Sequence, residues 1–330
     1  MEKRRFADLE LSTLMLGTVQ FGLPYGVANR SGQPPYAEVR RILECAFEGG
    51  VNCLDTAASY GSSELILGQA LRDLGMSERV VVVSKVCHLA AEYPSGRIAD
   101  AAVEDSVATS LARLGLDALP ICLFHRDQDF KYVESLLKLR DRGMVRHIGV
   151  SCDSPVGSSS VVSSGLCEAV QIPLNVVDRR FVRAGVVKTA KERKLALFAR
   201  SIYLQGLLIL ADGKTPLDLR EVIPVRQRLR ALAGEAGISL AELLVRYALS
   251  IDGVTCALVG VETVKQMRHN IELFSKGPLD PVLIKSIDEE MPDLPERIVA
   301  PGRWSRRMVD VKSRTVSQET GNDTDAREAE

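Results

Sequence analysis

Eight short apolar runs alternate with amphipathic helical stretches along most of this chain of 330 residues. The runs are rich in β-branched residues and almost continuously apolar, which is typical of strands in a parallel sheet covered on both faces. Eight strand-plus-helix units in series favour the α/β fold class and, within it, a (β/α)8 TIM barrel. The strands are expected at 13–17, 51–55, 80–86, 119–124, 146–151, 168–174, 195–200 and 255–259. The helices are expected at 37–49, 63–74, 98–115, 131–142, 155–164, 184–193, 219–236 and 262–274.

Additional elements are expected around this barrel. Residues 3–10 can form a hairpin that plugs its bottom. Residues 238–250 form an extra amphipathic helix, with Ser239 as its N-cap and Glu242 three positions later. A further helix is expected at 280–290.

The chain is expected to form one domain, and a competing architecture remains. Residues 1–305 form the barrel, whereas the polar residues 306–330 are expected to be disordered because they cannot bury enough apolar surface. The alternative is a doubly wound sheet. Neither GxGxxG nor GxxxxGK[ST] occurs, which disfavours dinucleotide-binding and P-loop sheets but leaves other open α/β sheets.

The composition limits the kinds of partner. Lys and Arg number 42 and Asp and Glu 43, so the formal net charge is −1 and gives no support for nucleic-acid binding. The seven cysteines contain no CxxC pair, so neither a metal site nor a disulfide scaffold is expected. No secretory signal and no apolar stretch of about 18 residues is present, so we expect a cytoplasmic protein outside the membrane.

Four polar residues stand at or just after the ends of predicted strands. Asp55 and Tyr60 follow the second strand, Lys85 ends the third, and His125 follows the fourth. A parallel barrel brings its strand C-terminal ends to one face, and that face carries the chemistry in TIM-barrel enzymes. We therefore expect these four side chains to meet.

An acid, a phenol, an amine and an imidazole together can move a proton to or from a substrate oxygen. A free phenol has a pKa near 10, and we expect the Lys85 ammonium to lower the pKa of Tyr60. Asp55 supplies the counter-charge that a buried ammonium requires. His125 can donate a hydrogen bond to a carbonyl oxygen and orient it. None of these groups provides a hydride, so a nicotinamide cofactor is the natural complement.

Over about residues 10–275 the chain resembles the aldo-keto reductases, which are NAD(P)H-dependent barrels. The opening "LGTVQFG", the segment "NCLDTAASYGSSELILGQAL", the strand "VVVSKV" and the strand "ICLFH" are similar to that family's motifs in order. The five-residue step from Asp55 to Tyr60 is the same. The resemblance implies that Tyr60 is the general acid, tuned by Lys85 and Asp55, and that His125 orients the substrate carbonyl.

The resemblance also implies residues that contact the nicotinamide and pyrophosphate. "IGVSC" resembles the family's GVSN, so Ser151 matches a carboxamide contact while Cys152 replaces the Asn. Gln171 matches the second carboxamide contact. Arg200 stands where the family has a Tyr that stacks on the nicotinamide, and a planar guanidinium can also stack on a ring. Ser201, Leu204 and Gln205, in "ARSIYLQGLL", are expected along the phosphates.

The adenosine end is implied by "LVGVETVKQMRHNI". Gly260 and the helix N-terminus from Thr263 are expected to face phosphate. Asn270 matches the family's adenine-binding Asn. Gln266 replaces an Arg that often clamps the 2′-phosphate, and Lys265, with Arg268, can substitute. NADP is the expected cofactor, with NAD as the alternative.

Two other functions stay open from the sequence. Lys85 could form a Schiff base in a lyase or aldolase if it were uncharged, although Asp55 argues for a charged lysine. The chain could also be a regulatory subunit that binds a nicotinamide cofactor and turns over little. For an enzyme, the expected partner is a small carbonyl or alcohol, sugar-derived as a first guess. The loop 22–26 and Trp304 are candidates for the substrate pocket, with packing outside the barrel as the alternative for Trp304.

Overall fold

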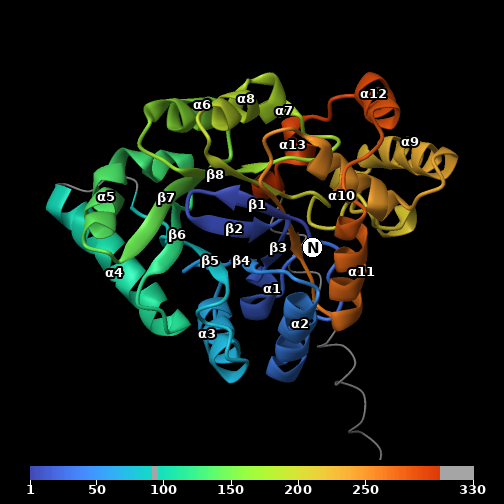
Figure 1. Cartoon of the computed structure of the whole chain (residues 1–330). Helices are drawn as coiled ribbons and strands as arrows, with labels where there is room; N and C mark the ends of the chain where they lie inside the picture. The colour runs from blue at the N-terminus through green and yellow to red at the C-terminus, as the bar shows by residue number, and fades with distance from the viewer. Residues whose placement is uncertain (91–95, 305–330) are drawn as a thin grey trace, which may run out of the picture.

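A computed structural model describes residues 1–90 and 96–304 and contains a closed barrel of eight parallel strands (Figure 1). The order around the barrel is β10-β3-β4-β5-β6-β7-β8-β9, so first and last barrel strands pair, with Leu14 opposite Ala257 and Gly17 opposite Gly260. The predicted (β/α)8 TIM barrel is confirmed. The strands are β3 (Leu14–Gly17), β4 (Cys53–Asp55), β5 (Val81–Lys85), β6 (Leu119–Phe124), β7 (Val145–Ser151), β8 (Ala169–Pro173), β9 (Ala196–Arg200) and β10 (Cys256–Gly260).

Helices surround the barrel and connect its strands (Figure 1). All the helices expected from the sequence are present, with boundaries shifted by up to three residues. The helices are α1 (Val19–Gly22), α2 (Tyr36–Glu48), α3 (Ser63–Asp73), α4 (Gly96–Leu114), α5 (Val133–Asp141), α6 (Pro155–Ser164), α7 (Arg180–Arg183), α8 (Val186–Glu192), α9 (Val222–Glu235), α10 (Leu240–Ser250), α11 (Val264–Ser275), α12 (Pro281–Glu290) and α13 (Glu296–Val299). Short 3-10 turns lie at Asp127–Tyr132, Asp212–Lys214, Leu217–Leu219 and Pro301–Arg303.

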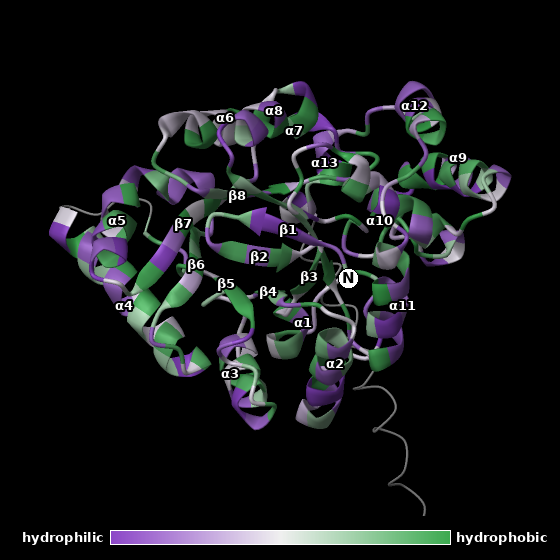
Figure 2. Cartoon of the chain, in the orientation of Figure 1, coloured by the Kyte–Doolittle hydropathy of each residue, from purple (hydrophilic) through white to green (hydrophobic). Residues whose placement is uncertain are grey.

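Alternating side chains of the strands build two apolar layers. Residues such as Leu16 and Val82 belong to the cluster shared with the surrounding helices, whereas their neighbours Met15 and Val83 belong to a second cluster of barrel residues. Figure 2 shows mostly apolar colour on the barrel strands and a mixture of polar and apolar residues along the surrounding helices. Both faces of the sheet are therefore buried, which explains why the strands read as continuous apolar runs.

The N-terminal hairpin lies across the barrel in Figure 1. Strands β1 (Lys3–Phe6) and β2 (Leu9–Ser12) pair in antiparallel fashion, and Phe6, Leu9 and Leu11 are buried in the same cluster as the barrel residues Met15 and Val83. The Phe6 ring meets His147 of β7 at 5.0 Å between centroids. The predicted plug is thus confirmed, and it leaves the C-terminal ends of the strands as the end where a site can form.

Three expectations concern segments outside the eight strand-plus-helix units: the cap of α10, the position of Trp304 and the C-terminal residues 306–330. Ser239 caps α10, and its hydroxyl accepts a hydrogen bond from the backbone N–H of Glu242. Trp304 packs against the apolar cluster of α9, α10 and α13, and its indole N–H donates to the carbonyl of Ile298 at 3.2 Å. Trp304 therefore has the packing contacts of the second alternative, and a role in the substrate pocket stays a prediction. The disorder expected for 306–330 concerns residues outside the described part of the chain.

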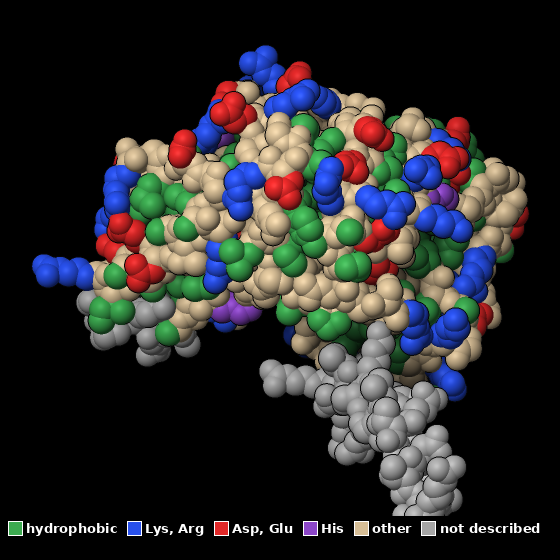
Figure 3. Space-filling view, turned by 90° about the horizontal axis from the view of Figure 1, so that it is seen from below, with side chains coloured by type: hydrophobic (Ala, Val, Ile, Leu, Met, Phe, Trp, Pro, Cys, Tyr) green, Lys and Arg blue, Asp and Glu red, His purple; other side chains and the backbone are tan. Residues whose placement is uncertain are grey.

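Charges of both signs lie on the face of the molecule shown in Figure 3. Figure 3 shows basic and acidic side chains interspersed over one face, in keeping with the balanced composition. Among residues 1–90 and 96–304, no helix is long and apolar enough to cross a membrane. Within the same residues, no group of His, Cys, Asp and Glu has the arrangement of a metal site.

Candidate active site

A buried ion pair lies at the C-terminal end of β4 and β5. Lys85 Nζ donates to Asp55 Oδ1 at 2.7 Å and to the carbonyl of Thr56 at 2.9 Å. Gln171 of β8 donates its Nε2 to the same Asp55 oxygen at 2.7 Å. The Lys85 side chain is 0% exposed and that of Asp55 4%. Because a buried charge must be paired and hydrogen-bonded, this network fixes both side chains in one geometry.

Tyr60 lies above this pair because two glycines allow close packing of its loop. A Cβ on Gly22 would come within 1.9 Å of the Tyr60 carbonyl oxygen, and a Cβ on Gly61 within 2.5 Å of the Gly22 carbonyl oxygen. The φ of Gly61 is +56°, which glycine adopts without steric cost. Lys85 Nζ then lies 5.0 Å from the centroid of the Tyr60 ring. The glycines of "LGTVQFG" and "YGSS" therefore position the phenol.

His125 completes the cluster from the end of β6. Its ring meets the Tyr60 ring edge to face at 5.5 Å between centroids. Its Nδ1 lies 3.0 Å from Ser59 Oγ. Burial, together with the positive charge of Lys85, lowers the pKa of His125 to about 2. The imidazole is therefore neutral at physiological pH, with its proton on one of the two ring nitrogens.

The pKa of Tyr60 does not follow the sequence-based expectation. Burial, followed by the negative charge of Asp55, raises the pKa of Tyr60 above its ordinary value. Burial also lowers the pKa of Lys85, opposed by the attraction of Asp55. The expectation that Lys85 would depress the pKa of Tyr60 is wrong in this structure, because burial, followed by the negative charge of Asp55, raises that pKa instead. Tyr60 is consequently a protonated phenol at neutral pH.

Residues at the ends of β7, β8 and β9 border this cluster. Ser151 Oγ donates to Gln171 Oε1 at 3.3 Å, and Gln171 in turn reaches Asp55, so all three belong to one network. Cys152 is buried, and its carbonyl accepts a hydrogen bond from Arg200 at 3.2 Å. Arg200 also forms an ion pair with Asp153. Its guanidinium is therefore held at the end of β9 beside the residues that the resemblance assigns to the nicotinamide.

The segment after β9 has a strained backbone. Ser201, Leu204 and Gln205 all have positive φ, at 63°, 48° and 53°. Such conformations cost about 1–3 kcal/mol each for residues other than glycine and persist where neighbours enforce them. Asn175 donates to the carbonyl of Ser201 at 3.0 Å, and Gln205 donates to Tyr25 Oη at 2.8 Å. Strain of this kind gathers at ligand sites, as expected for a segment that wraps a pyrophosphate.

Gly260 lies at the end of β10 in contact with Gln20 of α1. A Cβ on Gly260 would come within 2.4 Å of the Gln20 amide nitrogen and oxygen. Gln20 is 7% exposed, and in the described part of the chain its Oε1 is buried without a hydrogen-bond partner. A buried acceptor without a donor is uncommon in folded proteins.

Helix α11 contains the residues expected at the adenosine end. Asn270 is buried, accepts a hydrogen bond from Tyr203 Oη at 2.9 Å, and donates to the carbonyl of Gln266 at 3.0 Å. Gln266 folds back into a capping box with Thr263. Lys265 is exposed one turn away from Asn270. These residues are thus on one helix beyond β10, away from the Lys85 network.

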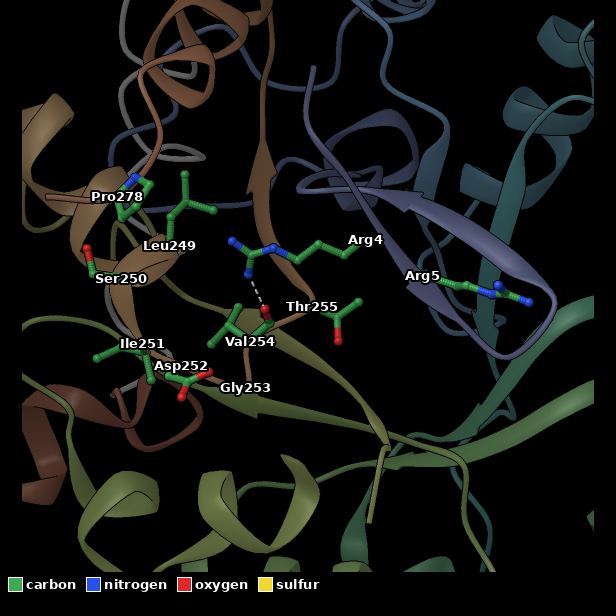
Figure 4. Close-up of a pocket in the computed structure, with 10 residues that line it drawn as sticks. All are labelled: Arg4, Arg5, Leu249, Ser250, Ile251, Asp252, Gly253, Val254, Thr255 and Pro278. Atoms are coloured by element: carbon green, nitrogen blue, oxygen red, sulfur yellow. Dashed lines mark hydrogen bonds between the residues drawn. The ribbon is translucent and has the colours of Figure 1, made fainter. Parts of the chain in front are cut away.

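A separate pocket lies at the opposite end of the barrel, beside the hairpin (Figure 4). Figure 4 shows Arg4 reaching the carbonyl of Val254, which lies just before β10 begins. Gly260, where the candidate site lies, ends the same strand. This pocket is therefore not part of the site. It is lined by Arg4, Arg5, Leu249, Ser250, Ile251, Asp252, Gly253, Val254, Thr255 and Pro278.

Sequence reasoning missed several residues of the site. Ser59 was not singled out, although it directly precedes Tyr60, and His88 was assigned no role, although its ring lies 4.7 Å from that of His125. His88 follows the Lys85 strand by three residues, which is a signal that the strand-end rule could have used. Gln20, within the quoted motif "LGTVQFG", was also missed. Only its unpaired oxygen reveals it.

A closed parallel barrel with this charged cluster at the C-terminal ends of its strands has the architecture of a TIM-barrel enzyme. A family model described as "Aldo/keto reductase family" matches residues 13–291. The chain therefore belongs to the aldo/keto reductase family and is an oxidoreductase.

The similar proteins include a reductase, a channel subunit and a solved aldo-keto reductase. One relative is the L-glyceraldehyde 3-phosphate reductase of Escherichia coli, 25% identical, with 77% of this chain and 84% of that protein covered. Another is a probable voltage-gated potassium channel subunit beta of Arabidopsis thaliana, 23% identical over 89% and 98% of the two chains. Among solved structures, the holo form of aldo-keto reductase AKR11C1 from Bacillus halodurans has a TM-score of 0.75 at 22% identity. It is matched over 90% of this chain and 99% of that chain, and this likeness shows the fold.

Proposed function

We propose that this protein uses a nicotinamide cofactor to reduce an aldehyde or ketone to an alcohol, or to run the reverse reaction. The observation that supports this proposal best is the buried Lys85–Asp55 pair beneath Tyr60, with the neutral imidazole of His125 against the same ring. The proposed catalytic residues are Asp55, Tyr60, Lys85 and His125. Together they handle one proton at one substrate oxygen.

In this proposal Tyr60 is the proton donor. Its raised pKa keeps the phenol protonated at neutral pH, so it can give its proton to the oxygen of a carbonyl as negative charge develops there. In the same proposal Ser59 donates to Nδ1 of His125, which leaves the imidazole proton on Nε2 to form a hydrogen bond to the same oxygen and fix its direction. Lys85 contributes positive charge beside the ring, which stabilises the phenolate left after transfer. Asp55 and Gln171 hold the ammonium in place.

The residues present fit a nicotinamide cofactor. Gly260 lacks a Cβ where one would meet Gln20, and the buried Gln20 Oε1 lacks a donor in the described part of the chain. Ser151, Gln171 and Arg200 would hold the nicotinamide end, and Ser201, Leu204 and Gln205 the pyrophosphate. The group supplies a hydride to the carbonyl carbon when it is bound.

A sugar-derived carbonyl compound is the proposed substrate. The Escherichia coli relative is named for the reduction of a glyceraldehyde phosphate, which supports a small polyhydroxylated substrate. Leu23 and Tyr25 are exposed in the loop that follows α1. Gln205, from the segment proposed to hold the pyrophosphate, donates a hydrogen bond to Tyr25 Oη. We therefore propose that this loop borders the substrate pocket.

The lyase alternative is disfavoured by the burial of Lys85. A Schiff base requires a free amine that can reach a substrate carbon. Lys85 is 0% exposed in its side chain, and Nζ already donates to Asp55 and to Thr56. The regulatory alternative has support from the name of the Arabidopsis relative, and turnover distinguishes it from an enzyme.

The test measures binding and turnover separately. NADH and NADPH are titrated into the wild type and Tyr60→Phe by fluorescence, and both proteins are then assayed with a panel of aldehydes, ketones and sugars. Binding retained in Tyr60→Phe with turnover lowered by about 10²–10⁴-fold supports the proposal. Binding without turnover on any carbonyl or alcohol would favour the regulatory subunit. Absence of binding to either nucleotide would contradict the proposal, and trapping of a substrate on Lys85 by borohydride would replace it with the lyase.

A further inference from the structure

The junction between β10 and α11 has an acceptor that lacks a donor. Gln20 Oε1 is buried against Gly260 with no partner among residues 1–90 and 96–304. An unmet buried acceptor is destabilising, and a ligand that donates a hydrogen bond to it removes that penalty. The donors that a dinucleotide carries in its sugar parts are ribose hydroxyls. A ligand that donates a hydrogen bond at this junction would satisfy Gln20 Oε1, and a ribose hydroxyl is one such donor.

The first turn of α11 bears on whether that ligand carries a phosphate group. A helix N-terminus binds phosphate through its free backbone N–H groups. At α11, Gln266 Oε1 accepts from the N–H of Glu262 at 2.7 Å and of Thr263 at 3.3 Å. Thr263 Oγ1 accepts from the N–H of Gln266 at 3.2 Å. Side chains of the protein thus accept hydrogen bonds from the N–H groups of Glu262, Thr263 and Gln266, which are three of the donors that a phosphate at this terminus would use.

A glutamate from a distant helix accepts a hydrogen bond from one further first-turn donor. Glu38 of α2 accepts a hydrogen bond from the N–H of Val264 at 2.9 Å, across 226 positions in sequence. The Glu38 side chain is only 22% exposed. Its other oxygen pairs with Arg41 at 3.0 Å. A carboxylate therefore already occupies the favourable anion position at this terminus.

A second carboxylate belongs to the same cluster. Gln266 Nε2 donates to Glu262 Oε2 at 2.8 Å, so the amide that replaces the expected Arg is directed to an acid. Lys265 and Arg268 are the nearby cations, and both are exposed. Attraction between exposed charges is weak and is screened by salt, whereas Glu38 lies directly on the helix N–H. The balance is therefore unfavourable for an added phosphate.

We propose that this terminus selects a dinucleotide whose adenosine ribose has a free 2′-hydroxyl, so that the protein prefers NAD(H) to NADP(H). Glu38 and Glu262 accept hydrogen bonds from the ribose hydroxyls, as acidic residues do in other NAD sites. The same carboxylates repel a 2′-phosphate. The inference rests on the proposed function, and it reverses the sequence-based preference for NADP that Lys265 suggested.

The first experiment compares dissociation constants, with no turnover required. NADH and NADPH are titrated by fluorescence, and ADP and adenosine 2′,5′-bisphosphate are used as competitors that carry only the adenosine end. We expect NADH to bind on the order of tenfold more tightly than NADPH or better, and ADP to compete better than the bisphosphate. Tighter binding of NADPH would overturn the inference and leave the proposed function intact. Failure of both dinucleotides to bind would overturn both.

Charge-neutral variants test the assigned residues. In Glu38→Gln and Glu262→Gln, alone and together, an amide oxygen can still accept the same hydrogen bonds while the negative charge is lost. The double variant is expected to bind NADPH on the order of tenfold more tightly than the wild type, with a small change for NADH. Glu44→Gln is the matched control, since Glu44 lies on the same helix and pairs only with Arg40 in the structure. An NADH-to-NADPH ratio that is equal in the double variant and the control would refute the role of these two carboxylates.

Discussion

The ion pair between Lys85 and Asp55 gives the sharpest prediction for stability. Replacement of Lys85 by Met keeps all but the last atom of the side chain's length and leaves the Asp55 carboxylate buried with Gln171 as its remaining side-chain partner among the described residues. Removal of one member of a buried pair typically costs about 3–5 kcal/mol because the other charge is left uncompensated. The side chains are 0% and 4% exposed, so water cannot replace the lost partner. We expect Lys85→Met to lose about 3–5 kcal/mol of unfolding free energy.

A double-mutant cycle separates charge from packing. In Asp55→Asn with Lys85→Met both charges are gone, and Gln171 can still donate to the Asn oxygen. Replacement of a whole buried pair by uncharged residues is often nearly neutral, so the double variant is expected to be more stable than Lys85→Met alone by about 2 kcal/mol or more. Free energies are measured from urea unfolding followed by circular dichroism, with slopes compared among variants.

An exposed pair in the same protein provides the control. Lys138 Nζ and Asp100 Oδ2 are also 2.7 Å apart, but the Lys138 side chain is 61% exposed. Lys138→Met is therefore expected to change the unfolding free energy by less than about 1 kcal/mol. Our reasoning is refuted if Lys85→Met loses no more stability than Lys138→Met, or if the double variant gains nothing over Lys85→Met.

Two further predictions concern the neighbours of this pair. Gly22→Ala places a Cβ within 1.9 Å of the Tyr60 carbonyl oxygen. We therefore expect the unfolding free energy, measured in urea, to fall by about 1–3 kcal/mol and kcat to be lower. An unchanged kcat would contradict the positioning role of this glycine. His125→Phe tests the depressed pKa of His125, which is about 2 in the folded state and near 6.5 in the unfolded state. Between pH 6.5 and pH 5 only the unfolded state of the wild type therefore takes up a proton at this residue. Over that interval the unfolding free energy of the wild type is expected to fall by about 2 kcal/mol relative to that of the variant. Equal acid dependence of unfolding in the two proteins would show that the imidazole titrates normally in the fold.

Much of the fold could be predicted because its strands are buried on both faces. The strand predicted from the run "LPICLF" has the same ends as β6 in the structure, and the helix predicted at 155–164 has the same ends as α6. The barrel class then follows from the repetition of strand and helix. The four-residue helix α1, hidden within "LGTVQFG", could not be predicted, because so short a helix depends on its packing and not on a periodic pattern.

The residues of the candidate site could be predicted better than the pKa shifts within it. The strand-end rule correctly brought Asp55, Tyr60, Lys85 and His125 to one end, since position along a parallel strand determines the face of the barrel. The direction of the Tyr60 pKa could not be predicted, because it depends on burial and on how closely Asp55 offsets Lys85. The contact between Glu38 and α11 joins residues 226 positions apart and has no signal in either segment.

The closure of the barrel by its first and last strands has a consequence during synthesis of the chain. Leu14 to Gly17 pair with Ala257 to Gly260, so β3 keeps one edge unpaired until residue 260 has left the ribosome. At about 5–20 residues per second this interval lasts on the order of tens of seconds. Throughout it the apolar hairpin residues Phe6 and Leu9 lack part of the surface that later covers them. We therefore expect nascent chains of this protein to depend on chaperones, and shortened chains that end before β10 to aggregate.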